Sequence, residues 1–358
     1  MTGSRTFLVT GVTGYLGSRL VPRLLDEGHR VRVLTRDRGK VASREWRDRV
    51  EVVEGDATSA ETLGEALDGV DVAFYLLHSM DGRPGFVERD RDLATTFGRV
   101  AHERGVGRIV YMSGLHPHDV ELSEHLASRV EVGELLMGSG TPTAVLQAAV
   151  IVGSGSASFE MLRHLTHRLP AMITPKWLDN RIQPIGVRDV LHYLVAAADL
   201  PPEVNRTFDV GGPDVLTYRE MIVRFARIQG LRRRLIVSVP VLTPRLASLW
   251  VGFVTPVPSA IARPLVGSLV HEVVCTEHDL DDLVGAPPGG GPTRSSRSCS
   301  LHTTSWTRLP TSGRAMALGT GVTKPTHRLA SRGVSTGTLT ISRRRRPWIR
   351  AKRTIISR

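Results

Sequence analysis

Short apolar runs alternate with longer amphipathic stretches along residues 1–153 of the chain. The runs are rich in Val, Ile and Leu, as is typical of strands buried on both faces of a parallel sheet. The stretches between them repeat apolar residues at helical spacing and end near glycines. This alternation predicts an α/β fold with a doubly wound parallel sheet. The predicted strands are 7–10, 31–35, 50–53, 72–77, 108–112 and 143–152, and the predicted helices include 61–67, 86–103 and 122–137.

The pattern divides the chain into three regions. Residues 1–153 form the predicted sheet domain, and residues 154–285 are predicted to be a smaller, substrate-side lobe of the same extended domain. Within this lobe, residues 235–270 are apolar but are interrupted by prolines, so they do not suit a membrane span. They are interpreted as core or pocket wall, with a peripheral membrane contact or a dimer face as the alternative.

A glycine-rich turn joins the first predicted strand to the helix that follows it. Gly11 permits a tight turn, Gly14 leaves room for a phosphate, and Gly17 lets the helix pack against the strand. The helix N-terminus supplies amide donors and the positive end of the helix dipole. The turn therefore predicts a Rossmann-type dinucleotide site, with an ordinary strand-to-helix turn as the alternative. Its predicted cofactor-binding residues are Gly11, Thr13, Gly14, Tyr15, Leu16 and Gly17.

The ends of the next strands carry further candidates for cofactor binding. Arg36 follows the second strand at the place where an acidic residue would bond the ribose of NAD, and a guanidinium there favours the 2′-phosphate of NADP. NAD remains the alternative, because Asp37 is able to bond the ribose. Asp56 and Ala57 follow the third strand, where the adenine would rest, although Asp56 also suits the cap of the next turn. Leu77 and His78 end the fourth strand beside the expected nicotinamide pocket.

Charge is distributed unevenly between the body and the C-terminal region. All 35 acidic residues lie at or before Asp282, whereas residues 286–358 contain 15 Lys or Arg and no acid. Residues 1–285 therefore hold 32 basic and 35 acidic side chains, so the net charge of +12 arises in the tail. The body thus gives no support for specific nucleic-acid binding.

Residues 286–358 are rich in Ser, Thr, Arg, Pro and Gly and lack periodic apolar positions, so we expect them to be disordered. Their composition is also what a GC-rich coding sequence yields when it is translated out of frame, which favours a frame-shifted terminus. A solvated tail is one alternative. A basic arm that holds nucleic acid or anionic lipid through Arg343–Arg346 is the other.

Several motifs resemble the atypical, extended short-chain dehydrogenase/reductase superfamily, in particular its NmrA-like NAD(P)H-binding branch. The resemblance extends from about Phe7 to about Asp282 and implies kinship with the nucleotide-binding accessory subunit of respiratory complex I. Members of a narrower bacterial subgroup continue into a further C-terminal domain, and this chain has the basic region in that place. The motifs that carry the resemblance are 10–17, 75–80, 108–114, 122–129, 154–160, 183–185 with 189–190, and 208–213.

The reductases of this superfamily use a Ser after the fifth strand with a Tyr and a Lys four residues apart on the next helix. Tyr protonates the carbonyl oxygen, and Lys lowers the pKa of that Tyr and holds the ribose. Ser113 matches the Ser, but His125 and Arg129 occupy the places of Tyr and Lys. Arg129 would hold the ribose, and His125 would donate a proton near neutral pH. A histidine that only lines the helix surface or the pocket is the alternative.

These residues together predict an NADP(H)-dependent oxidoreductase that acts on a small-molecule substrate, quinone- or isoprenoid-like in character. A catalytically silent NADP(H) sensor or assembly factor is the alternative. The two cysteines, Cys275 and Cys299, lack metal-ligand spacing, and His164 and His167 lack a third ligand, so no metal is expected. The N-terminus has no leader pattern, which predicts a cytoplasmic protein.

Overall fold

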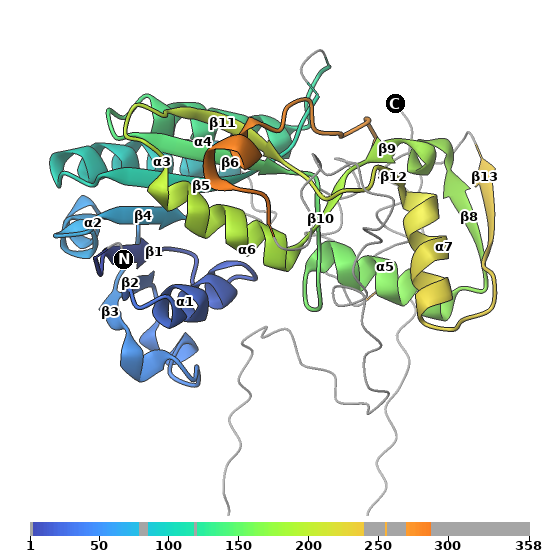
Figure 1. The fold of residues 1–358 in the computed structure, drawn as a ribbon, viewed down its shortest axis with the longest axis horizontal. Coiled ribbons are helices and arrows are strands. Elements are labelled where there is room, and N and C mark those ends of the chain that lie inside the picture. Colours follow the sequence, from blue (N-terminus) through green and yellow to red (C-terminus); the bar gives the residue numbers. More distant parts are fainter. Residues whose placement is uncertain (1–2, 79–84, 118–119, 240–254, 256–269, 288–358) are drawn as a thin grey trace, which may run out of the picture. The chain divides into compact units, whose positions relative to one another are not determined.

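Seven parallel strands form the central sheet of the protein (Figure 1). The structure is a computed structural model, and it describes residues 3–78, 85–117, 120–239, 255 and 270–287. In spatial order the strands are β11 (Arg206–Val210), β6 (Thr143–Ala148), β5 (Arg108–Gly114), β4 (Val72–Tyr75), β1 (Thr6–Val9), β2 (Arg30–Thr35) and β3 (Glu51–Glu54).

The strand order changes direction at β1, which pairs with β2 on one side and with β4 on the other. Thr10 joins the ends of β1 and β4, because its hydroxyl donates to the Phe74 carbonyl at 2.9 Å and accepts from the Leu76 N–H at 3.0 Å. In doubly wound sheets, ligands bind beyond the carboxyl ends of the strands at such a switch point. The predicted glycine-rich turn lies at this point.

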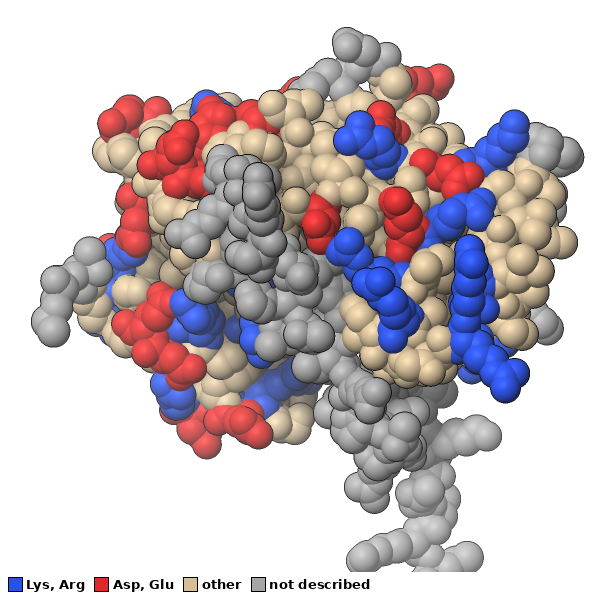
Figure 2. All heavy atoms as spheres, turned by 45° about the vertical axis from the view of Figure 1, so that its right-hand side comes forward, with Lys and Arg blue, Asp and Glu red and all other residues tan. Residues whose placement is uncertain are grey.

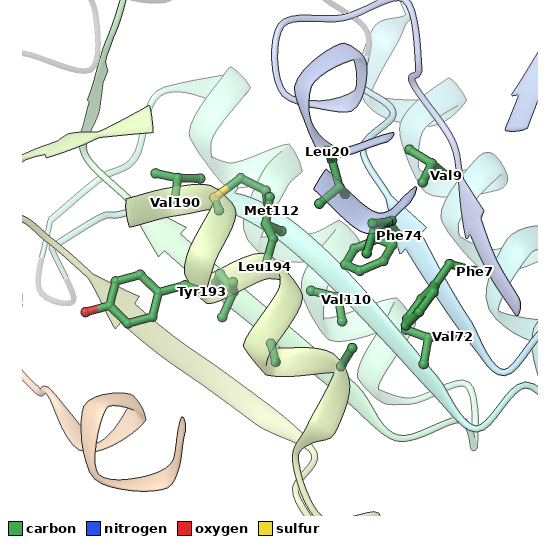
Figure 3. Close-up of a cluster of buried hydrophobic side chains, with 14 of the residues drawn as sticks. Phe7, Val9, Leu20, Val72, Phe74, Val110, Met112, Val190, Tyr193 and Leu194 are labelled. Carbon is green, nitrogen blue, oxygen red and sulfur yellow. The ribbon is translucent and has the colours of Figure 1, made fainter. Parts of the chain in front are cut away.

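Helices cover both faces of the sheet. One core cluster joins α1 and α6 to one face, through side chains such as Leu20 and Leu194 against Phe7 and Phe74 (Figure 3). The other cluster joins α2, α3 and α4 to the opposite face around Tyr75 and Tyr111. These helices are α1 (Gly17–Asp26), α2 (Ala60–Leu67), α3 (Phe86–Glu103), α4 (Glu124–Met137) and α6 (Val187–Ala196).

A smaller hydrophobic cluster lies beyond β6, around Phe159, Ile222 and Phe225. We call the part built from residues 157–182 and 214–239 the satellite lobe. Its helices are α5 (Ala157–Arg168) and α7 (Tyr218–Ile228), and its strands β8 (Ala171–Pro175) and β13 (Leu235–Val239) pair in parallel. The remaining elements are β7 (Val150–Val152), β9 (Arg181–Ile182), β10 (Pro184–Gly186), β12 (Leu216–Thr217), α10 (Asp279–Val284), and the 3-10 helices η1 (Arg38–Lys40), η2 (Arg47–Arg49), η3 (Lys176–Asp179) and η4 (Ala197–Asp199).

The predicted parallel α/β fold is confirmed, with differences at some elements. The apolar run predicted as one strand over residues 143–152 divides at Ala149, because β6 pairs with β5 and β11 whereas β7 pairs with β10. The fourth strand ends at Tyr75 rather than Leu77. Segments from 154–285 also return to the main sheet as α6 and β11, so the two predicted regions interleave along the chain.

The last described segment packs against the main sheet. Leu280 of α10 is buried in the core that also contains Leu20, and the Tyr193 hydroxyl donates to Asp281 Oδ1 at 2.5 Å. Most of the two segments with open interpretations, 235–270 and 286–358, lies outside the described residues. Only 235–239, Thr255, Val270 and 286–287 are described within them.

Candidate functional site

The glycine-rich turn connects β1 to α1 at the switch point of the sheet. Gly11 has a φ of +62°, and a Cβ there would lie 2.3 Å from the Leu76 carbonyl oxygen. A Cβ on Gly17 would lie 2.5 Å from the Gly11 carbonyl oxygen. Packing alone therefore requires glycine at both positions. Gly14 differs, because an added Cβ would meet only the Gly11 oxygen, at 3.0 Å, and its outer side is open to a ligand.

Backbone amides of this turn are available to bind an anion. The N–H groups of Thr13, Tyr15 and Leu16 donate no hydrogen bond to another described residue. Helix α1 also begins without a side-chain cap and without an acidic residue in its first turn. Free amide donors at the positive end of a helix dipole attract phosphate. The turn therefore fits a dinucleotide, whose pyrophosphate these amides would hold.

Arg36 is the first residue after β2, and its side chain is exposed. The neighbouring polar side chains are engaged elsewhere. Arg38 donates from Nη2 to the Val52 carbonyl at 2.9 Å, and Asp37 accepts from the Gly39 N–H at 2.9 Å within its own turn. Among the described residues at this strand end, Arg36 is thus a guanidinium that remains available to a 2′-phosphate.

Asp56 and Ala57 lie in the turn that follows β3. The Asp56 carboxylate accepts hydrogen bonds from the Thr58 N–H and the Thr58 hydroxyl, both at 2.9 Å. The backbone bond from Thr58 is the main cause that lowers the pKa of Asp56. The carboxylate thus caps its own turn, as the alternative interpretation proposed, and its position near an adenine stays a prediction. Ala57 is buried against the same turn.

Two histidines and an arginine from different elements meet beyond the ends of β4 and β5. The ring centroids of His78 and His125 lie 6.5 Å apart, and the His125 ring lies 6.4 Å from that of Phe86. Arg129 follows one turn after His125 on α4, and its buried Nε has no hydrogen-bond partner among the described residues. The structure thus brings together three side chains, the first and last of which, His78 and Arg129, are 51 positions apart in the sequence.

Burial and the charge of Arg129 lower the pKa values of both histidines. Burial and then the Arg129 charge lower the pKa of His125 to about 4. Desolvation, followed by the charges of Arg129 and His125, lowers the pKa of His78. The expectation that His125 titrates near neutral pH is therefore wrong, because its surroundings disfavour the imidazolium.

Ser113 ends the buried part of β5 and faces α4. Its hydroxyl is 3.4 Å from the Arg129 carbonyl oxygen, to which it donates, and the Tyr111 hydroxyl donates to the same oxygen at 3.4 Å. The Ser113 side chain is only 2% exposed, so its hydroxyl supports the helix that carries Arg129. Leu77 is partly buried against the core on this side of the sheet. The catalytic assignments of Ser113, His125 and Arg129 remain predictions.

The structure adds one side chain, that of Phe86, that the sequence did not indicate as a site residue, and it shows where the side chain of the predicted residue Tyr15 lies. Phe86, at the start of α3, stacks near His125. The Tyr15 hydroxyl is buried next to the Ser156 side chain, and it lies 2.4 Å from where a Cβ of Gly153 would be. Tyr15 was predicted for its backbone position in the turn. The sequence around Tyr15, a large residue between two glycines, does not indicate that the Tyr15 side chain extends to Gly153.

The described part of the chain contains neither a candidate metal centre nor a candidate membrane-spanning helix. No group of three His, Cys, Asp or Glu side chains there is placed to hold a metal ion. His164 lies near Glu160, with Nε2 3.7 Å from Oε2, and has no further ligand of this kind. Within the same residues, the structure contains no helix whose length and apolar content would suffice to cross a bilayer.

Comparisons with known proteins agree with this geometry. A family model described as NAD(P)H-binding matches residues 11–148, which include the glycine-rich turn, Arg36 and α4. Ceramide reductase of Caulobacter vibrioides is 30% identical over 232 residues, which cover 64% of this chain and 72% of that protein. The chain belongs to the NmrA-like NAD(P)H-binding branch of the atypical short-chain dehydrogenase/reductase superfamily. It is an NAD(P)H-binding, reductase-like protein.

Other members of this superfamily have similar sequences or folds. The (4-alkanoyl-5-oxo-2,5-dihydrofuran-3-yl)methyl phosphate reductase of Streptomyces griseus is 26% identical, covering 62% of this chain and 73% of that protein. The triphenylmethane reductase of Citrobacter sp. complexed with NADP(H) has a TM-score of 0.61 at 19% identity, covering 79% of this chain and 96% of that one. An NADPH-dependent quinone oxidoreductase of Escherichia coli also has a TM-score of 0.61, at 18% identity, covering 78% and 95%. The relation to the complex I subunit stays a prediction.

Proposed function

We propose that this protein is an NADPH-dependent reductase of a small, apolar, carbonyl-containing substrate, quinone- or isoprenoid-like in character. The observation that carries the proposal is the meeting of Arg129, His78 and His125 beyond the ends of β4 and β5, next to the switch point at β1 where the glycine-rich turn lies. The charges of Arg129 and His125 lower the pKa of His78, and the charge of Arg129 lowers that of His125, after burial in both cases; no acidic side chain contributes to either shift. The pocket is therefore electropositive and suits an oxygen that gains negative charge.

Each of these side chains would have a distinct role. When bound, NADPH would supply the hydride that reduces the carbonyl carbon, and the completing proton comes ultimately from solvent. Arg129 stays protonated, so its guanidinium would hold ribose hydroxyls and stabilise the negative charge that develops on the oxygen. His125 is neutral and would polarise the carbonyl by donating a hydrogen bond from its N–H. Arg36 would select NADPH over NADH through the 2′-phosphate.

The apolar character of the substrate is inferred from the residues around His125 and from relatives. The Phe86 ring lies 6.4 Å from that of His125, and Leu77 lies two residues after the end of β4, next to His78 in the chain. The relatives include enzymes named for ceramide, for a 3 beta-hydroxysteroid and for a sterol. A carbonyl or quinone oxygen would bind near the positive charge of Arg129, and an apolar skeleton attached to it would suit the neighbouring Phe86 and Leu77 side chains.

The test is NADPH oxidation with a panel of benzoquinones, long-chain ketones and enals, measured for three variants. Arg129→Ala is expected to weaken NADPH binding, and His125→Asn is expected to lower kcat while the Kd for NADPH stays within about three-fold. His102→Asn is the matched control, because His102 is exposed on α3 and should change neither parameter. Binding of NADPH without turnover of any panel member, or equal rates in all variants, would contradict the proposal.

A further inference from the structure

The parallel pair β8 and β13 presents an apolar face to solvent. Ile173 is 62% exposed, Leu235 is 64% exposed and Val237 is 49% exposed. Val237 pairs with Ile173 and Leu235 pairs with Ala171, and alternate residues of a strand point to the same side. The three large side chains therefore stand together on one side, which we call the ribbon face. The opposite side, which includes Met172, packs into the satellite-lobe core.

Basic residues frame this face. The satellite lobe holds ten Lys or Arg and four Asp or Glu, whereas residues 1–285 as a whole carry a net charge of −3. Figure 2 displays Lys and Arg side chains gathered over this lobe, among uncharged surface. Three of the four acids are already paired to arginines, in the pairs Arg163–Glu160, Arg219–Asp179 and Arg224–Asp214. The excess positive charge is therefore not compensated within the lobe.

The excess cations lie at the two ends of the ribbon face. Because β8 and β13 are parallel, both strands begin at the same end, where the Leu235 N–H donates to the Pro170 carbonyl at 3.0 Å. Arg232 and Arg233 lie three and two residues before β13 at this end, and Lys176 follows β8 at the other end. All three side chains are exposed, and none makes an ion pair with an acid in the described part of the chain.

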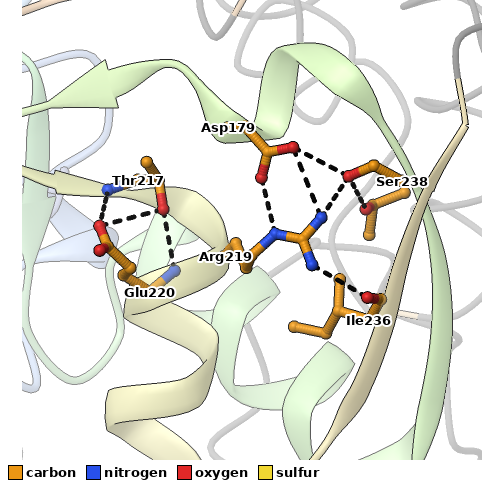
Figure 4. A network of polar contacts seen from close by, with 7 residues as sticks. Asp179, Thr217, Arg219, Glu220, Ile236 and Ser238 are labelled. Atoms are coloured by element: carbon orange, nitrogen blue, oxygen red, sulfur yellow. Dashed lines mark hydrogen bonds and ion pairs between the residues drawn. The ribbon is translucent and has the colours of Figure 1, made fainter.

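The ribbon face is held firmly by the elements beneath it. Arg219 of α7 donates from Nε to Asp179 Oδ1 at 2.6 Å and from Nη1 to the Ile236 carbonyl at 2.9 Å (Figure 4). The Ser238 hydroxyl donates to Asp179 Oδ2 at 2.9 Å and also contacts Arg219. This network fixes β13 to α7 and η3. The exposed aliphatic side chains therefore belong to an ordered surface whose backbone is already hydrogen-bonded.

We propose that the ribbon face docks the protein onto the surface of an anionic lipid bilayer. Aliphatic side chains flanked by unpaired Lys and Arg match the acyl boundary and the negative headgroups of such a membrane. A second copy of the chain is a poorer fit, because a two-fold interface would bring the same cations face to face. Nucleic acid would use the cations but offers no apolar layer for Ile173, Leu235 and Val237. This inference does not depend on the proposed reductase activity.

The test is co-sedimentation of the full chain with vesicles of phosphatidylcholine, alone or with 30–50 mol% phosphatidylglycerol, a content that is roughly that of strongly anionic membranes. Arg232→Glu with Arg233→Glu is expected to weaken binding to the anionic vesicles by about thirty-fold or more. Arg30→Glu with Arg44→Glu is the matched control. These two arginines are exposed on the main sheet domain, form no ion pair with described acids, and give the same change of net charge.

A second measurement reports insertion of the apolar side chains. Because the chain already has five Trp, quenching by brominated lipid is compared with that of the unaltered protein. Val237→Trp is expected to add emission that is quenched, whereas Leu283→Trp, on the exposed side of α10, is expected to add emission that stays unquenched. Equal vesicle binding by both pairs of charge variants would assign membrane attachment to charge elsewhere in the chain and would overturn the proposal. A dimer in sedimentation velocity that Val237→Asp dissociates, with vesicle binding unchanged, would overturn it in favour of self-association.

Discussion

Replacement of Arg36 tests how the protein distinguishes NADPH from NADH. Arg36 is the guanidinium at the end of β2 that forms no hydrogen bond or ion pair with a described residue, although its charge acts on Asp56; Arg38 is bonded to the Val52 carbonyl, and Asp37 caps its own turn. A hydrogen bond to a charged group contributes about 1.5–3 kcal/mol, and the exposed position of Arg36 favours the lower part of that range. Arg36→Ala should therefore raise the Kd for NADPH by about ten- to thirty-fold.

Arg36→Asp should have a larger effect, because it replaces attraction by repulsion. Two unit charges about 4 Å apart interact with about 1 kcal/mol in water, so repulsion from the 2′-phosphate brings the expected loss to about a hundred-fold. The Kd for NADH should change little, since NADH carries a hydroxyl there. Arg38→Ala is the matched control and should change the Kd for NADPH by less than about three-fold, because its guanidinium already bonds β3.

Fluorescence titration of NADPH and NADH at low and high salt measures both constants for each variant. The preference for NADPH should shrink as salt rises, because the pair between Arg36 and the 2′-phosphate is exposed and is screened. Equal affinities of the two cofactors in the unaltered protein, or an equal loss of NADPH affinity in Arg36→Ala and Arg38→Ala, would refute this assignment of Arg36.

Three further predictions concern the turn, the pH dependence and the C-terminal region. Gly11→Ala should lower the free energy of unfolding by about 2 kcal/mol or more in urea titrations, because Gly11 has a φ of +62° and an added Cβ would lie 2.3 Å from a carbonyl oxygen. Gly14→Ala should keep the fold and weaken NADPH binding. The pKa of His125 falls from 6.5 to about 4 on folding, so the free energy of unfolding should decrease as the pH falls from 6.5 toward 4. Urea titrations at pH 7 and pH 5 measure this decrease, which should be smaller in His125→Asn. A chain that ends after Pro287 should keep its Tm and its NADPH affinity, because α10 and its bond from Tyr193 to Asp281 are retained; a lower Tm would show that residues beyond 287 support the fold.

The sequence predicted the elements whose patterns are local. The strands around Phe7 and Ile109 are uniformly apolar, and the helix 86–103 combines regular spacing with a glycine after its end, so each was placed correctly or within a few residues. The division of residues 143–152 was not predicted, because β6 and β7 form one continuous apolar run. Only the partners, β5 and β11 for β6 and β10 for β7, distinguish the two strands.

The candidate site was predictable to the extent that sequence spacing fixes proximity. Residues His125 and Arg129 share a helix face because they lie four positions apart. Their meeting with His78 depends on β4 and β5 being neighbours in the sheet, a pairing that the sequence analysis did not predict. The pKa of His125 was not predictable, because it arises from burial that α3 and the ends of the strands produce together. The ribbon face was also not predicted from the sequence, because β8 and β13 are short strands with 59 residues between the end of β8 and the start of β13.

Replacement of Tyr and Lys by His125 and Arg129 changes how the rate of a reductase in this family should depend on pH. A Tyr donor with a lowered pKa loses activity as its hydroxyl ionises, which limits the rate at high pH. Here Arg129 stays protonated and His125, with a pKa of about 4, stays neutral, so neither group changes its charge between about pH 6 and 9. The kcat for the best substrate of the panel should therefore vary by less than about three-fold across this range. A bell-shaped profile with a limb near pH 6.5 would show that His125 ionises in the complex, and it would restore the imidazolium as the proton donor.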